Sequence, residues 1–187
     1  MPVLTPERSA SSDIFSRPEV AVRAAASIAD KAIGENRAVG LTVNAHRATV
    51  LPADRGARQR LKILQLLAAV EADGRTPLGE SLVSGLNRLR HGMTAIIITA
   101  SQDPAFIRPL ATLRGRGIRA VVILLDAPAF GPAAAEGSDG NGDAADGAVS
   151  AETRRQRSRA IRHALAEYEL PTFVVGPDRA LSEVLAP

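Results

Sequence analysis

Apolar residues recur along this chain at two spacings, one typical of helices and the other of strands. A spacing of three or four residues predicts helices at residues 17–34, 54–70, 77–89, 104–115 and 151–169, and a short last helix after Asp178. Runs of apolar, often β-branched residues predict strands at residues 38–43, 47–51, 93–100, 118–125 and 172–175. This order predicts an α/β protein, in which helices cover both faces of a mostly parallel sheet in three layers.

Short polar residues stand where the predicted helices begin. Asp54, Thr76 and Asp103 are each predicted to cap the helix that follows. Proline comes next after the last two, and its fixed φ angle suits the first turn of a helix.

The apolar stripe of each helix predicts which side chains are buried. In the helix after Asp54, Leu61, Leu64 and Ala68 are expected to face the core, and Leu66, Leu67 and Val70 are expected to widen this apolar face. In the last long helix, Ile161, Leu165 and Tyr168 are expected to form the buried stripe.

The chain length suits one domain with a flexible arm and a flexible insertion. Residues 1–16 are polar and rich in serine, so we expect a flexible N-terminal arm. Residues 17–187 form the predicted domain. Within it, residues 127–150 are mostly Ala, Gly, Asp and Pro, which cannot bury enough apolar surface to become ordered.

Composition removes several classes of function. The chain has no cysteine, which excludes disulfides, zinc–thiolate sites and cysteine nucleophiles. Its formal net charge of +3 is small and gives no sign of a polyanionic partner. No apolar run approaches the ~20 residues of a membrane span, and the N-terminus lacks the layout of a signal peptide. We therefore expect a cytoplasmic protein, or a membrane-associated one if the chain is a piece of a longer protein.

Arginines crowd the predicted helix at residues 151–169: Arg154, Arg155, Arg157, Arg159 and Arg162. At helical spacing they spread around most of the polar circumference, and no aromatic residues alternate with them to stack on bases. We therefore expect a solvated helix whose charge is offset by the acidic residues before it, and no specific nucleic-acid binding.

The segment at residues 75–103 places a threonine and an aspartate near one edge of the predicted sheet. Thr76 opens a helix, and Asp103 follows the strand at residues 93–100. In α/β proteins ligands bind beyond the carboxyl ends of the strands, and hydroxyl and carboxylate oxygens suit Mg²⁺. One hydroxyl and one carboxylate are too few for a near-octahedral shell, so we predict no Mg²⁺ and no other cofactor.

Five short phrases, taken in order, resemble part of a known family. They are AVRAAASIA at residues 21–29, VGLTV at 39–43, LPADRG at 51–56, GRTPL at 74–78 and AVVILLD at 120–126. Their order and spacing resemble the C-terminal half of domain-of-unknown-function family 58, whose members have a von Willebrand factor A-like fold. The likeness covers roughly residues 18–130, together with the last strand and helix.

The resemblance implies a metal site built from three loops, most of which this chain lacks. The family draws Asp-x-Ser-x-Ser from the end of its first strand, a threonine from a second loop and an aspartate from a third. Thr76 matches the second loop, and Asp103 lies two residues beyond the third position. Asp13 is followed by Ile-Phe-Ser and does not match. The resemblance thus implies a fold without its first central strand, with a gap flanked by the strands at residues 38–43 and 93–100.

The family's members commonly pair with MoxR-type AAA+ ATPases, so the resemblance implies a non-enzymatic adaptor domain as the first functional hypothesis. We expect the contact surface at the carboxyl edge of the sheet. Its predicted residues are Arg75, Thr76, Ser101, Gln102 and Asp103.

The implied gap between these two strands would leave backbone groups on both of them without a strand partner. Pro2 and Pro6 leave few good strand residues in the arm, so we expect contact across the gap with a partner or a second copy of the chain. Two alternatives to the adaptor stay open. One is a small α/β hydrolase or phosphotransferase that uses Asp103 or Asp126, and the other is a degenerate remnant without a function of its own.

Overall fold

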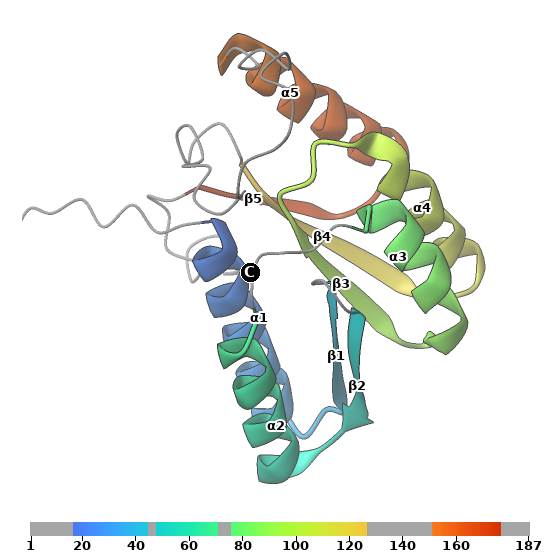
Figure 1. Cartoon of the computed structure of the whole chain (residues 1–187). Helices are drawn as coiled ribbons and strands as arrows, with labels where there is room; N and C mark the ends of the chain where they lie inside the picture. Colours follow the sequence, from blue (N-terminus) through green and yellow to red (C-terminus); the bar gives the residue numbers. More distant parts are fainter. Residues whose placement is uncertain (1–16, 45–47, 71–75, 127–150, 177–187) are drawn as a thin grey trace, which may run out of the picture.

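The computed structural model describes residues 17–44, 48–70, 76–126 and 151–176, and its elements follow the predicted order (Figure 1). The helices are α1 (Arg17–Gly34), α2 (Gly56–Ala68), α3 (Leu78–Gly85), α4 (Ile107–Gly115) and α5 (Ala151–Glu167), with 3-10 turns η1 (Leu86–Arg88) and η2 (Pro104–Phe106). The strands are β1 (Val39–Asn44), β2 (Ala48–Asp54), β3 (Thr94–Thr99), β4 (Arg119–Leu125) and β5 (Thr172–Val175). The predicted arm, the predicted insertion and the helix after Asp178 lie outside the described residues.

The strands form two sheets. β3, β4 and β5 make a parallel sheet in that order, and β1 and β2 make a separate antiparallel hairpin. The prediction of an α/β protein with parallel strands is therefore confirmed, whereas the described residues show no single continuous sheet. Within those residues β1 pairs only with β2, and β3 pairs only with β4. Each of these two strands thus has one edge whose backbone groups lack a described strand partner.

Helices cover both faces of the parallel sheet (Figure 1). On one face, Leu110 of α4 and Leu165 of α5 pack in one cluster with Val122 and Leu124 of β4. Because side chains alternate along a strand, Ile123 of β4 points to the other face. Burying a side chain of this size stabilises the fold by roughly 1.5–3 kcal/mol, so these clusters hold the layers together.

The helix α1 joins the parallel sheet to the hairpin. Its Val20 packs with Ile123 and Val175 of the parallel sheet. Farther along, Ala29 and Ile33 belong to a second cluster that includes α2 and the hairpin. One helix therefore contacts both sheets, which fixes the hairpin beside the three parallel strands.

The buried face of α2 agrees with the prediction at Leu67 but differs at the centre of the predicted stripe. Gln59, Ile63 and Leu67 are buried, whereas Leu61 is 56% exposed and Leu64 is 39% exposed. Hydrogen bonds explain this difference. The Gln59 amide donates to two backbone carbonyls of the hairpin, and these bonds fix the rotation of the helix about its axis. Apolar spacing alone could not reveal this preference.

Two other sequence predictions are wrong for local reasons. Asp54 is not a helix cap, because β2 runs on to it and Arg55 takes the N-cap position without a side-chain bond. The Asp54 carboxylate instead accepts from the N–H of Arg55 at 2.8 Å. Tyr168 is exposed because α5 ends just before it, and Leu170 takes the buried position after a turn at Glu169, whose φ is 51°.

Candidate functional site

The predicted contact residues that follow β3 lie at the carboxyl edge of the parallel sheet. β3 and β4 run in register, with Thr99 opposite Leu124. The segments that follow them therefore leave the sheet at the same edge. Ser101 and Gln102 come soon after β3, and Asp126 comes directly after β4. This is the edge at which α/β proteins place their ligands.

The loop after β3 is held by three successive side-chain contacts to its own backbone. Thr99 Oγ1 accepts from the N–H of Ser101 at 3.0 Å, and Ser101 Oγ accepts from the N–H of Asp103 at 3.2 Å. Asp103 Oδ1 then accepts from the N–H of Ala105 at 2.9 Å, which confirms its predicted capping role. These bonds are the local turns that Ser, Thr and Asp favour. They fix the shape of the loop through contacts within the loop itself.

The backbone of Thr76 forms a hydrogen bond near this edge. Its carbonyl accepts from Asn44 Nδ2, at the end of β1, at 2.9 Å. The helix α3 begins at Leu78, and the carbonyl of Pro77 accepts from the N–H of Ser81 at 3.1 Å. Pro77 therefore occupies the N-cap position that was predicted for Thr76, and the exposed Thr76 stands one residue ahead of it.

The start of α3 packs tightly against η2. Gly79 is buried, and a Cβ added to it would lie 3.2 Å from the carbonyl carbon and oxygen of Ala105. This close approach ties the segment after Thr76 to the segment after Asp103. Of the five predicted contact residues, the structure brings four toward one edge, and Arg75 lies outside the described residues.

Asn44 has a buried acceptor at this edge. Its Nδ2 is bonded to Thr76, but its Oδ1 is buried and has no hydrogen-bond partner among the described residues. A buried acceptor left unpaired costs about 1–3 kcal/mol. The end of β1 is therefore a place where a donor would be stabilising, and the sequence analysis did not single it out.

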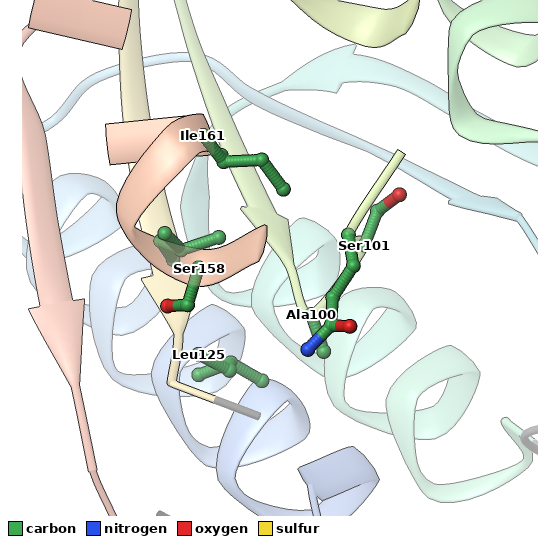
Figure 2. Close-up of a pocket in the computed structure, with 7 residues that line it drawn as sticks. Ala100, Ser101, Leu125, Ser158 and Ile161 are labelled. Carbon is green, nitrogen blue, oxygen red and sulfur yellow. The ribbon is translucent and has the colours of Figure 1, made fainter. Parts of the chain in front are cut away.

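A shallow hollow lies beside Ser101 and Gln102 (Figure 2). Figure 2 shows Ala100 and Ser101 on one side of it, and Ser158 and Ile161 of α5 on the other. The empty space among its lining residues is about 170 Å³, open solvent included. Small-molecule pockets usually hold roughly 300–1,000 Å³, whereas this hollow encloses no space for a water molecule and is only a shallow surface feature.

Ser158 fastens α5 to the end of β4. The side chain is 5% exposed, and its Oγ donates to Asp126 Oδ1 at 2.9 Å. The Asp126 N–H donates to the carbonyl of Val175 at 2.9 Å, so Asp126 is bonded both to α5 and to β5. Ser158 was not predicted from the sequence. It precedes Ile161 and Leu165 at helical spacing, and that spacing places it on the buried stripe of α5.

The candidate metal and catalytic residues Asp103 and Asp126 each make a hydrogen bond within the fold. Asp103 caps η2, and the half-buried Asp126 accepts from Ser158. In the described part of the chain, no three His, Asp or Glu side chains gather in a way that could hold a metal ion. That the chain does not bind Mg²⁺ stays a prediction. The alternative that it is a hydrolase or phosphotransferase using Asp103 or Asp126 also stays a prediction.

The arginines of α5 lie mostly in solvent. Arg155, Arg157, Arg159 and Arg162 are exposed, and Arg155 lies 4.0 Å from the carboxylate of Glu152. This exposure fits the predicted solvated helix. None of the helices in the described ranges is long and apolar enough to cross a membrane.

Comparisons with known protein families, with curated proteins and with solved structures each found no match.

Proposed function

We propose that this chain is a non-enzymatic interaction domain with a von Willebrand factor A-like fold, and that it acts as an adaptor for a MoxR-type AAA+ ATPase. One observation carries the interaction role. The end of β1, the start of α3 and the loop after β3 meet at one edge, around the Asn44–Thr76 bond and the Gly79–Ala105 contact. The family and the ATPase partner come from the sequence resemblance.

The arrangement of helices and strands supports the proposed fold. An antiparallel hairpin precedes three parallel strands, and helices lie on both faces of the parallel sheet. The proposed fold has one more strand between the hairpin and β3. That is the place where the described strands β1 and β3 each lack a second neighbour.

Contact at this edge would rely on hydrogen bonds and shape. The loop at residues 99–105 is already fixed by its own turns, so binding costs little ordering of its backbone. Gln102 is half-buried beside the hollow, and Thr76 is exposed.

The test is a binding measurement with the purified chain and the MoxR-type ATPase of the same organism. Gln102→Arg places a long charged side chain in the proposed contact, and Gln156→Arg makes the same change on the exposed surface of α5. We expect Gln102→Arg to weaken binding at least about tenfold, which corresponds to about 1.4 kcal/mol. Gln156→Arg should bind like the parent. No binding by the parent, or equal affinity for the two variants, would contradict the proposal.

A further inference from the structure

The outer face of α2 carries an apolar seam that nothing in the described structure covers. Ala57, Leu61, Leu64 and Ala68 are all exposed. Their spacing of four, three and four residues is the repeat that coiled-coil helices use for their contact positions. Leu61 and Leu64, at 56% and 39% exposed, lie at its centre.

The exposure of this seam is fixed by the opposite face of the helix. Gln59 Nε2 donates to the carbonyl of Val39 at 2.7 Å and to that of Pro52 at 2.9 Å. Turning α2 to bury Leu61 would break both bonds and expose Ile63, which is now buried. Figure 1 shows α2 lying along α1, and α2 also contacts the hairpin. The helix therefore presents its seam outward as part of the fold.

The residues around the seam are basic. α2 contains no Asp or Glu. Arg58, three residues before Leu61, is exposed at the border of the seam, and Lys62 is exposed one turn later on the same side of the helix but farther from the seam. Neither is in a salt bridge within the described residues. Arg60, at the opposite border of the seam, pairs with Asp30 of α1. Among the described residues, one side of the seam thus carries positive charge that no salt bridge offsets.

We propose that this seam is a docking site for an amphipathic helix of a partner protein, with acidic residues beside its own apolar stripe. The four-three-four spacing matches a helix laid along α2, since such helices place their anchors at the same repeat. The acidic character follows from Arg58 and Lys62, because opposite charges flanking a helix–helix seam select the partner.

The same charges argue against a second copy of this chain. Two α2 seams packed against each other would bring Arg58 and Lys62 of both copies together, and like charges at such a contact disfavour it. The docking site lies on a different helix from the carboxyl edge of the sheet and does not depend on the proposed ATPase contact.

The test uses two synthetic peptides of about three heptads with leucine at the contact positions. One carries glutamate at the flanking positions and the other carries lysine. Fluorescence anisotropy measures the affinity of each for the full chain. We expect the glutamate peptide to bind at least about tenfold more tightly than the lysine peptide. We also expect this binding to weaken as salt rises.

Variants locate the site. The double variant Leu61→Ser and Leu64→Ser should lose the glutamate peptide, while the control Val83→Ser, which changes an exposed apolar side chain of α3, should keep it. Because the leucines are exposed, both proteins should fold, and their circular dichroism should match the parent. Arg58→Glu with Lys62→Glu should reverse the preference between the two peptides.

Four results would overturn the proposal. The first is no binding of the glutamate peptide by the parent chain, and the second is binding that survives the Leu61 and Leu64 changes. The third is dimerisation through the seam, seen as sedimentation of the parent as a dimer that the double serine variant abolishes. The fourth is binding to phosphatidylglycerol vesicles without binding to the glutamate peptide, which would assign the seam to a membrane surface.

Discussion

Gln59 stands on the buried face of α2 where an apolar residue would be expected, and its amide bonds the helix to the hairpin. Replacing it by leucine keeps the volume similar but leaves the carbonyls of Val39 and Pro52 without this donor. We expect Gln59→Leu to lower the free energy of unfolding by roughly 1–3 kcal/mol, since it removes two part-buried hydrogen bonds that contribute about 0.5–1.5 kcal/mol each.

Urea denaturation followed by circular dichroism measures this change. Gln65→Leu is the matched control, because Gln65 lies exposed on the same helix, and it should alter stability by less than about 0.5 kcal/mol. Equal midpoints for the two variants would mean that Gln59 does not hold the hairpin.

At the scale of single residues, the sequence predicted the roles that follow from local chemistry. Asp103 caps the turn before α4 because a short carboxylate ahead of a proline can reach the second N–H of the helix. The inward position of Gln59 could not be predicted. It depends on two carbonyls that lie 20 and 7 residues away and meet only in the folded chain.

At the scale of elements, the apolar runs located the strands closely, and β5 begins and ends where it was predicted to. β2 was the exception, since it continues through Pro52 to Asp54, whereas the predicted strand ended at residue 51 and Asp54 was predicted to cap the next helix. A proline is tolerated there because strands with one unpaired side do not need every N–H. The register of the hairpin depends on close pairing of β1 with β2, and we expect a side chain at position 40 of β1 to disturb that pairing.

Gly40 lies opposite β2 with no room for a side chain. A Cβ built on it would be 2.9 Å from the nitrogen of Ala53 and 3.0 Å from the carbonyl oxygen of Leu51, and the strand register shifts between Val39 and Leu41. Both contacts are backbone atoms that cannot swing aside. We expect Gly40→Ala to destabilise the protein by about 1–3 kcal/mol, as overpacking does.

Thermal unfolding measured beside Gly34→Ala gives the comparison. Gly34 ends α1, and an added Cβ there meets no atom within 4 Å. Alanine at that position should be neutral or slightly stabilising, because it restricts the unfolded chain. A Gly40→Ala protein as stable as the Gly34→Ala protein would show that the hairpin can shift to admit a side chain.

At the scale of the whole molecule, β3 presents an apolar edge without a second described strand partner. Ile96 of β3 is 44% exposed, although the strand is apolar along most of its length. We expect the chain to self-associate at micromolar concentration, and a charge on this edge strand, Ile96→Lys, to return it to a monomer.

Analytical ultracentrifugation compares the parent, Ile96→Lys and the control Val83→Lys, which changes an exposed side chain of α3. The control should associate like the parent. A monomeric parent whose amides resist hydrogen exchange throughout β1 and β3 would mean that the sheet is closed within one chain, and the idea of an open edge would have to be abandoned.

Hydrogen–deuterium exchange, with and without the MoxR-type ATPase, tests the central claim most directly because it locates the contact. We expect slower exchange at residues 76–81 and 99–105, where the start of α3 and the loop after β3 meet. Exchange that is unchanged in both segments, or slowed only in other parts of the chain, would contradict the claim that this edge of the sheet binds the partner.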